Sequence, residues 1–196
     1  HEQLVWGPEG WTEEELRIFG DRRALAGRDV LEFGAGAGQG ARWMAAQGAR
    51  VVASDISLGM LQVGREIDER AGRSLPMVQA DAGVLPFADD TFDIAFSAYG
   101  AVPFIADTAS LMRELARVMR PGGRLAFSTT HPFRWAFPDV PDTSGLVAQY
   151  DYFDTTPYVE RSGDLVTYVE HHRTFGGRIR EMVAAGLTVE DVVEPT

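Results

Sequence analysis

Short apolar runs alternate with amphipathic stretches along residues 29–130. The runs are nearly continuous in hydrophobic residues, as in strands covered on both faces, and they span residues 30–33, 51–54, 77–80, 92–97 and 124–130. The segments between them have helical composition or apolar spacing at 39–46, 57–71 and 108–119. Strands that alternate with helices predict a parallel sheet with right-handed crossovers. We therefore expect a doubly wound, mostly parallel sheet in a three-layer α/β/α fold.

Polar residues at the starts of these segments predict where the helices begin. Ser57 precedes a helix whose inward face we expect to hold Met60, Leu61, Ile67 and Ala71. Asp107 or Thr108 begins the helix that ends before Pro121. Thr12 and Glu15 form a capping box and predict a helix over 13–19. Ahead of it lie Trp6 and Trp11, which either fold over a ligand as a lid or close the edge of the core.

The regular alternation stops at residue 131. The segment 131–173 mixes prolines and turns with aromatic residues, and its residues 165–169 alternate as in a strand. It is either a cover over the sheet's carboxyl edge or a surface hairpin packed by its own side chains. Thr174 then caps a helix that runs to Ala185, and residues 187–193 predict a sixth strand.

One domain accounts for the 196 residues. We expect an N-terminal arm and helix (1–28), a core (29–130), the insertion described above (131–173) and a C-terminal helix and strand (174–196). The family resemblance described below implies a seventh, antiparallel strand, for which no sequence remains. The chain also begins with His1 rather than methionine. Either the sheet ends at six strands or the sequence is a piece of a longer chain.

Charge and composition limit the kinds of molecule that the protein is expected to bind. The net charge of −11 repels nucleic-acid phosphates and anionic membrane surfaces, so we expect neither as a partner. The chain has no cysteine, which excludes disulfides and thiolate metal sites, and we expect no metal. It contains no apolar run of the length that spans a bilayer and no visible signal peptide, which predicts a cytoplasmic protein. The sequence does not predict the oligomeric state.

The sequence 32–40, Glu-Phe-Gly-Ala-Gly-Ala-Gly-Gln-Gly, predicts a binding loop between the first strand and its helix. Glycines allow positive φ and the close approach of a ligand, and the following helix start presents unpaired N–H groups. Glu32 lies inside the strand, where an unpaired carboxylate would be costly. Asp55 and Asp81 end the next two strands, so three acids are predicted at one crevice.

These residues resemble a known family. The stretch 32–38 resembles the E/D-x-G-x-G-x-G signature of class I S-adenosylmethionine-dependent methyltransferases, and later motifs of that family match in order at Asp55, at 81–82, at 92–97 and at 120–125. The resemblance implies a Rossmann-like fold and S-adenosyl-L-methionine as cofactor, with S-adenosyl-L-homocysteine as its product. The cofactor-binding positions that it implies are Glu32, Gly34, Ala35, Gly36, Gly38, Asp55, Ile56, Met60, Asp81, Ala82, Ser97 and Tyr99.

Within this resemblance each position has a role. The loop cradles the methionine end, Asp55 takes the ribose hydroxyls, and Asp81 and the Ala82 N–H hold the adenine. Ser97 and Tyr99 would lie near the sulfonium. The alternative for both aspartates is capping or turn formation after a strand. Met60 either packs against the adenine or belongs to the core.

The acceptor is expected to be a small molecule, methylated by in-line displacement. A general base is needed only for a hydroxyl or a protonated amine. Its candidates are His131, His171 and His172, while Tyr99 and Tyr152 could orient the acceptor. The alternative for each of them is a structural role, which is the commoner one for a lone histidine.

Two other functions fit part of the pattern. Residues 36–41 also satisfy G-x-G-x-x-A, so a nicotinamide-dependent oxidoreductase is one alternative. It gives no role to the motifs at 81–82 and 120–123. The other is a non-catalytic binding module with a methyltransferase fold, against which the intact cofactor positions weigh.

Overall fold

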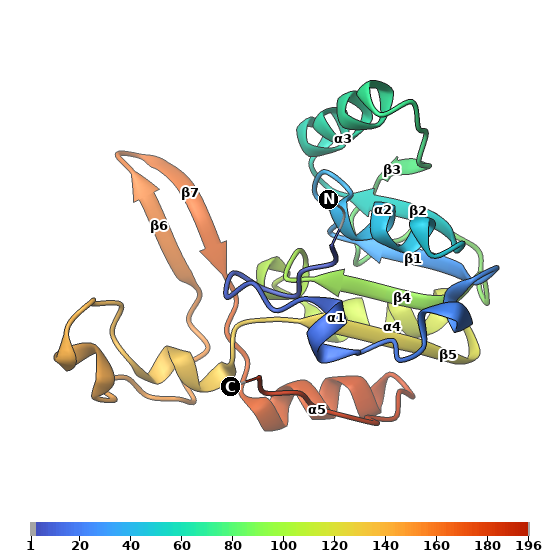
Figure 1. Cartoon of the computed structure of the whole chain (residues 1–196). Coiled ribbons are helices and arrows are strands. Elements are labelled where there is room, and N and C mark those ends of the chain that lie inside the picture. The colour runs from blue at the N-terminus through green and yellow to red at the C-terminus, as the bar shows by residue number, and fades with distance from the viewer. Residues whose placement is uncertain (1–2, 196) are drawn as a thin grey trace.

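The computed structural model describes residues 3–195, so residues 1, 2 and 196 of the predicted domain lie outside it. It contains the expected parallel sheet, with five strands in the order β3-β2-β1-β4-β5 (Figure 1). These strands are β1 (Asp29–Phe33), β2 (Arg50–Asp55), β3 (Met77–Gln79), β4 (Phe92–Ala98) and β5 (Met119–Ser128). All four neighbouring pairs are parallel. The predicted Rossmann-like α/β class is therefore confirmed.

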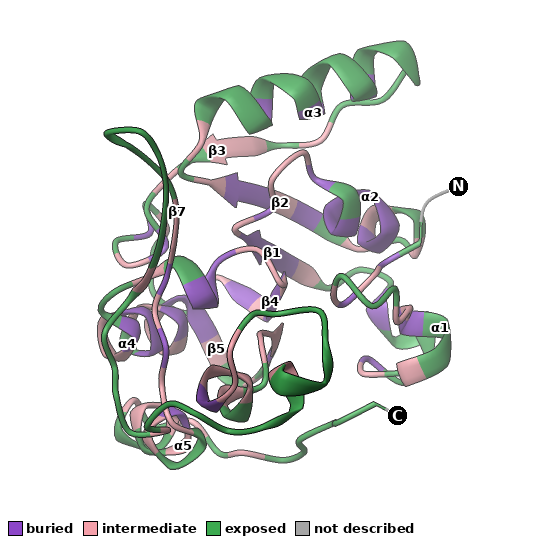
Figure 2. Cartoon of the chain, turned by 90° about the vertical axis from the view of Figure 1, so that its left-hand side faces the viewer, coloured by how far each residue is buried: buried purple, intermediate pink, exposed green. Residues whose placement is uncertain are grey.

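Helices cover both faces of the sheet, as the alternation along the chain requires. One face is covered by α2 (Gln39–Ala46) and α3 (Leu58–Arg70), together with the N-terminal segment that contains α1 (Glu13–Leu16). The other is covered by α4 (Thr108–Val118) and α5 (Phe175–Ala184). Figure 2 looks toward the carboxyl ends of the strands and shows these layers on either side of the sheet. Successive strand residues accordingly enter two cores: Val30 faces the α2 side and Leu31 faces α4.

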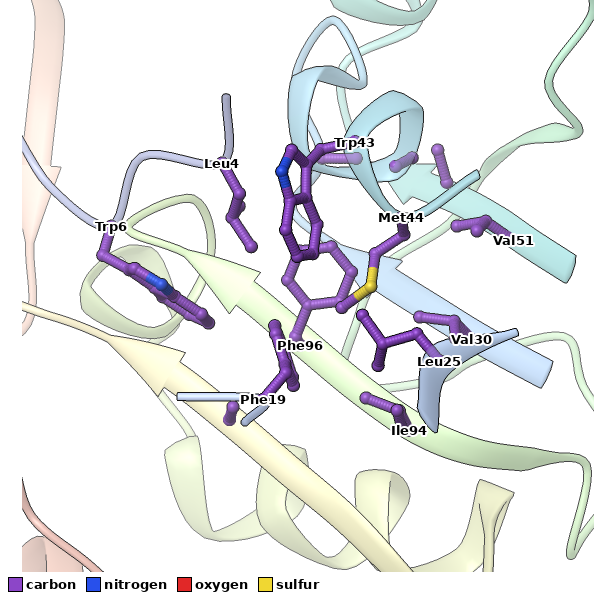
Figure 3. Packing of buried hydrophobic residues seen from close by; sticks show 14 residues of the cluster. Leu4, Trp6, Phe19, Leu25, Val30, Trp43, Met44, Val51, Ile94 and Phe96 are labelled. Atoms are coloured by element: carbon purple, nitrogen blue, oxygen red, sulfur yellow. The ribbon is translucent and has the colours of Figure 1, made fainter. Parts of the chain in front are cut away.

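The N-terminal segment belongs to the core. Trp6 is buried and packs against Phe19 and Phe96, with ring centroids 5.5 and 6.3 Å away (Figure 3). Its indole N–H donates to Glu13 at 2.9 Å. Of the two readings of the tryptophans, core closure is the one that fits Trp6. Trp11 is only half-buried.

The first helix is shorter than predicted. The capping box of Thr12 and Glu15 forms as expected, but α1 ends at Leu16 because Arg17 adopts a left-handed conformation with φ 53°. The chain then reverses, and the Phe19 N–H donates to Glu13 Oε1 at 2.8 Å. A short 3₁₀ turn, η1 (Arg22–Leu25), leads into β1.

The predicted inward face of α3 is mostly wrong. Leu61 is buried, but Met60 and Ile67 are 43% and 38% exposed and Ala71 is also exposed. The reason is the position of α3 beside the short edge strand β3, which covers only a narrow stripe. That stripe consists of Leu61, Gly64 and Asp68.

The insertion contains a hairpin of β6 (Tyr158–Ser162) and β7 (Leu165–Glu170), of which only β7 was predicted. The hairpin stands beyond the carboxyl ends of the sheet strands (Figure 1). Three short 3₁₀ turns complete the elements: η2 (Val102–Phe104), η3 (Pro132–Ala136) and η4 (Thr143–Leu146).

The predicted strand over 187–193 does not form. Leu187 packs against the α4 side of the core, but the described residues after α5 join no sheet. Alternating apolar residues predict an extended backbone, whereas a strand also needs a partner edge. The observed sheet ends at β5, one strand short of the prediction. None of the helices over residues 3–195 has the length and hydrophobicity needed to span a bilayer.

Candidate active site at the carboxyl edge

The glycine loop follows β1 directly and is closed in by the segment after β4. Gly34 has φ +64°, and a Cβ there would lie 2.6 Å from the Ala101 Cβ and 2.7 Å from the Gly100 carbonyl carbon. Gly100 in turn has no room for a Cβ beside the Gly34 carbonyl oxygen. Both glycines are therefore required where the two segments cross. The crossing brings the end of β4 against the loop.

Asp55 ties the loop to the next helix. Its Oδ2 accepts from the Gly36 N–H at 2.7 Å, and its Oδ1 accepts from the Ser57 N–H at 2.8 Å. Ser57 caps α3, as predicted, by accepting from the Met60 N–H at 3.3 Å. The turn-forming role and the proximity to the loop are thus both observed for Asp55.

Asp81 lies at the same edge, because the Ala80 N–H donates to the Asp55 backbone carbonyl at 3.0 Å. Its exposed side chain accepts from the Gly83 N–H at 2.8 Å, forming a turn. Ala82 is buried against the α4 side of the core. The predicted juxtaposition of loop, second acid and third acid is therefore present in the backbone.

The remaining loop positions are held by main-chain contacts. The Ala35 N–H donates to the Ser54 carbonyl at 2.9 Å, and Gly38 begins α2 as its N-cap residue. On the rim, Ile56 is 69% exposed. The Met60 Cε lies 3.5 Å from the Cβ position of Gly36, so Met60 overhangs the loop rather than entering the core.

Glu32 is the most strongly perturbed acid of the site. It is buried, and its Oε2 accepts from the Ala41 N–H at 2.7 Å. Burial raises the pKa of Glu32 to about 8, although hydrogen bonds from the first turn of α2 and the charge of Arg42 oppose the shift. A side chain at Gly40 would collide with Glu32 and with Phe96. Glu32 therefore organises the start of α2 from inside the sheet.

Two predicted positions lie at the end of β4. Ser97 is fully buried and its Oγ has no hydrogen-bond partner in the described structure, so its side chain does not reach the crevice. Tyr99 adopts φ 61°, which is a strained conformation for an aromatic residue. Its hydroxyl lies 2.7 Å from the Thr130 Oγ1. The strain fits a segment forced to cross the Gly34 turn.

Glu170 is a residue that sequence reasoning missed. It ends β7 and is buried, with Oε1 accepting from Thr130 at 2.8 Å and Oε2 accepting from the Tyr168 hydroxyl at 2.7 Å. Desolvation and the bond to Glu170 raise the pKa of Tyr168. The only feature of the sequence that could have indicated it is an acidic residue at the end of the alternating run 165–169, and such residues are common on protein surfaces.

The candidate histidines have different surroundings. His131 is exposed, accepts from the Phe133 N–H at Nδ1 and donates from Nε2 to Glu194 at 2.7 Å. His172 is buried, and its Nε2 donates to the Tyr152 carbonyl at 2.8 Å. Its Nδ1 has no partner within residues 3–195. Burial, and then the charge of Arg173, lower the pKa of the neighbouring His171, which keeps that imidazole neutral at pH 7.

The aromatic side chains of the insertion pack in a continuous series. Trp135 lies 5.3 Å from Tyr158 and 6.2 Å from His172 between ring centroids. Tyr168 continues the series to Phe104 of η2 at 5.4 Å. Tyr150 and Phe153 remain 60% and 74% exposed. The insertion is thus packed by its own rings and anchored beside the carboxyl edge.

An open hollow of about 570 Å³ lies at the opposite end of the sheet. Its lining includes the first residues of β1 and β4 and the arginines Arg50 and Arg120. These arginines pair with Asp29 at 2.7 and 3.0 Å. The motifs at 92–97 and 120–125 begin at this edge, where Phe92 and Arg120 line the hollow. Because Arg120 is held there by its ion pair with Asp29, we assign the edge a structural role.

Comparison with known proteins agrees with this geometry. A methyltransferase-domain family model matches residues 31–127. The protein named demethylmenaquinone methyltransferase from Corynebacterium kroppenstedtii is 41% identical over 127 residues, which cover 63% of this chain and 49% of that protein. The protein of the same name from Mycolicibacterium paratuberculosis is 43% identical over 106 residues. The chain spans about half the length of the curated relatives it matches.

Solved structures resemble more of the chain. The S-adenosylmethionine-dependent methyltransferase of Mesorhizobium loti has 28% identity and a TM-score of 0.72, and the match covers 94% of this chain and 85% of that one. A Listeria monocytogenes protein assigned to the same class has a TM-score of 0.77 at 21% identity, over 93% of this chain and 86% of that one, and shows likeness of fold. The chain is a member of the class I S-adenosylmethionine-dependent methyltransferases. The comparisons give no support to the oxidoreductase or to the non-catalytic module.

Proposed function

We propose that the protein transfers the methyl group of S-adenosyl-L-methionine to a small aromatic molecule at the carboxyl edge of the sheet. The observation that carries this proposal is the convergence of three segments there. The glycine loop donates from Gly36 to Asp55 at 2.7 Å, and the end of β4 crosses Gly34 directly. Carboxyl edges of open parallel sheets are where such folds bind ligands.

The residues present fit the cofactor. A Cβ at Gly36 would meet only the Met60 Cε, at 3.5 Å, so the loop backbone is open to a ligand on that side. A cationic sulfonium and ammonium suit a crevice bordered by Asp55 and Asp81. By family resemblance the cofactor would be held by the loop 34–38, Asp55, Met60, Asp81 and Ala82.

When bound, S-adenosyl-L-methionine supplies an activated methyl group and leaves as S-adenosyl-L-homocysteine. The chain contributes mainly alignment, since an in-line displacement gains most from a fixed approach of the two reactants. Asp55 fixes the loop, and Glu32 fixes the start of α2. The crossing of Gly34 and Gly100 holds the segment after β4, which includes Tyr99, against the loop. The aromatic insertion would exclude water from the acceptor side.

The class of acceptor is inferred from the insertion and the charge. Rings such as Trp135, Tyr152 and Tyr168 offer faces and edges that suit a planar aromatic molecule. The net charge of −11 disfavours a nucleic-acid acceptor. The relatives named for demethylmenaquinone also point to a ring-bearing small molecule.

Transfer of label from S-adenosyl-L-methionine tests the proposal. The purified protein would be incubated with the methyl-labelled donor and either a bacterial metabolite extract or 1,4-naphthohydroquinone. We expect label in a small, ring-containing product and none with the Asp55→Ala variant, whose loop is no longer tied to α3. Label found only in added RNA or protein, or in no acceptor, contradicts the proposal.

A further inference from the structure

A row of hydrogen-bonded hydroxyls connects the end of β4 with a buried acid on the hairpin. The Tyr99 hydroxyl lies 2.7 Å from the Thr130 Oγ1, and Thr130 donates to Glu170 Oε1 at 2.8 Å. The three residues come from the ends of β4, β5 and β7, which are far apart in the sequence. Among the described residues, the other carboxyl oxygen of Glu170 accepts from the Tyr168 hydroxyl at 2.7 Å.

The chemistry of the groups fixes the direction of these bonds. An ionised carboxylate only accepts, so Thr130 uses its single proton on Glu170. Tyr99 must then donate to Thr130, and its own oxygen keeps lone pairs with which to accept another proton. The row therefore runs from an accepting phenol oxygen to a carboxylate.

The backbone of Tyr99, at the outer end of the row, lies beside the glycine loop. Tyr99 immediately precedes Gly100, which contacts Gly34, whereas Glu170 is only 5% exposed. The strained φ of 61° at Tyr99 is maintained at this crossing. An acceptor that reaches the Tyr99 hydroxyl would thus be connected to a buried acid through two hydroxyls.

We propose that Tyr99, Thr130 and Glu170 form a relay that removes the proton of a hydroxyl-bearing methyl acceptor. This inference rests on the proposed function and extends it to the acceptor atom. As the acceptor oxygen bonds to the methyl carbon and the carbon–sulfur bond of the donor breaks, the acceptor's proton passes to the Tyr99 oxygen. The Tyr99 proton moves to Thr130, and the Thr130 proton moves to Glu170. A neutral ether, a neutral thioether and a protonated Glu170 result.

Other titratable groups face Glu170. Tyr168 bonds to it directly, and Thr130 and Glu170 line a small cavity of about 30 Å³. The charged or titratable side chains that also line this cavity are those of His171, His172, Arg173 and Arg178. Arg173 and Arg178 both pair with Glu181, at 3.3 and 3.4 Å. The two arginines therefore have a carboxylate partner other than Glu170.

Paired substitutions at Thr130 test the relay. Thr130→Ser keeps a hydroxyl and Thr130→Val keeps the shape without one. With labelled donor and metabolite extract or 1,4-naphthohydroquinone, we expect Thr130→Ser to retain activity, while Thr130→Val, Tyr99→Phe and Glu170→Gln each lose about 100-fold or more. Thr167→Val removes an exposed hydroxyl of the same hairpin outside the row and should be as active as wild type.

A second readout needs no turnover. In the unloaded protein, the infrared carboxylate band that disappears in Glu170→Gln should shift in Thr130→Val and stay unchanged in Thr130→Ser. Full transfer by the Thr130→Val and Glu170→Gln variants, or a band insensitive to Thr130→Val, overturns the relay and leaves the proposed function standing. No transfer by the wild-type protein to any acceptor overturns both.

Discussion

Glu32 acts on the site from within the sheet. Its carboxyl group is surrounded by core side chains, yet it accepts from the first turn of α2 and so positions the helix that follows the glycine loop. The ionised form is favoured by those N–H groups and by Arg42, but burial dominates and raises the pKa to about 8. Glu32 is therefore neutral in the folded protein over much of the pH range in which the unfolded chain ionises it.

Stability should consequently depend on pH through this residue. Since the pKa of Glu32 in the folded state lies above its ordinary value of 4.5, the stabilising contribution of Glu32 is complete below pH 4.5 and is lost as the pH rises toward about 8. The full span corresponds to roughly 5 kcal/mol at most. Urea unfolding of wild type and Glu32→Gln at pH 5, 7 and 9 checks this. We expect the difference in unfolding free energy between wild type and Glu32→Gln to shrink steadily as the pH rises. A difference that does not change with pH would contradict this prediction.

The single residues of the site were predictable to different degrees. Asp55 and the glycine loop follow from local spacing, because a strand, a turn and a helix start are set within a few residues. The role of Glu170 could not be predicted from local spacing, because its partner Thr130 comes close only when the hairpin folds back onto the sheet. Burial of Ser97 agrees with an apolar run covered on both faces, whereas the place near the sulfonium that the resemblance implied needs an accessible side chain.

At the scale of elements, a buried ion pair fastens α2 to α3. The Arg42 Nε lies 2.6 Å from Asp68 Oδ1, and both side chains are buried. The same guanidinium donates to the carbonyls of Ala37 at 2.7 Å and Gly64 at 2.9 Å. One arginine thus links the glycine loop to the two helices on its face of the sheet.

Removing this arginine should affect both stability and binding. Arg42→Ala leaves the buried Asp68 without its Arg42 ion pair, with the Leu75 N–H still donating to it, which destabilises the protein by roughly 3–5 kcal/mol. Because Ala37 also loses its donor, the dissociation constant for S-adenosyl-L-methionine should rise. Thermal melts and calorimetric titration measure the two effects. The exposed pair of Arg70 and Glu66 gives the control, since Arg70→Ala should change neither. An Arg42→Ala protein with unchanged melting temperature would contradict the account.

The elements themselves were largely predictable, and the exceptions have physical causes. The near-continuous apolar runs locate the sheet strands to within two residues, except at the start of β5, which was predicted at residue 124 and lies at Met119. The exposure of Met60 on α3 depends on how far β3 extends, and the missing strand at 187–193 depends on an edge partner. Neither is encoded in the local pattern.

At the scale of the whole molecule, the N-terminal segment closes one face of the sheet. Leu4, Trp6 and Phe19 belong to the same buried cluster as Val30 and Phe96 (Figure 3). A segment packed in this way is part of the fold's stability rather than a mobile cover. The burial of Trp6 could not be predicted from the residues next to it in the sequence, because its partner Phe96 lies on a distant strand.

Trp6→Ala should therefore destabilise the protein by about 3–5 kcal/mol. Trp11→Ala, at a half-buried position, should destabilise it less. Chemical unfolding of both variants gives the comparison. If Trp6→Ala kept wild-type stability and weakened only cofactor binding, Trp6 would be a lid after all.

The two ends of the sheet have different roles: the amino edge is structural, and the carboxyl edge holds the candidate binding site. The amino edge is held by ion pairs around Asp29, where bonds to Arg50 and Arg120 lower the pKa of the acid. The carboxyl edge gathers the glycine loop, Asp55 and the crossing at Tyr99. A single binding crevice at the carboxyl edge is the central claim.

Calorimetric titration of S-adenosyl-L-methionine into the wild-type protein and Asp55→Ala tests that claim most directly. Asp21→Ala removes a carboxylate that caps η1, away from the loop, and serves as the matched control. We predict one site per chain, undiminished in Asp21→Ala and weakened at least tenfold in Asp55→Ala, about 1.4 kcal/mol or more. Equal affinity in all three proteins, or no binding to the wild type, would contradict the account.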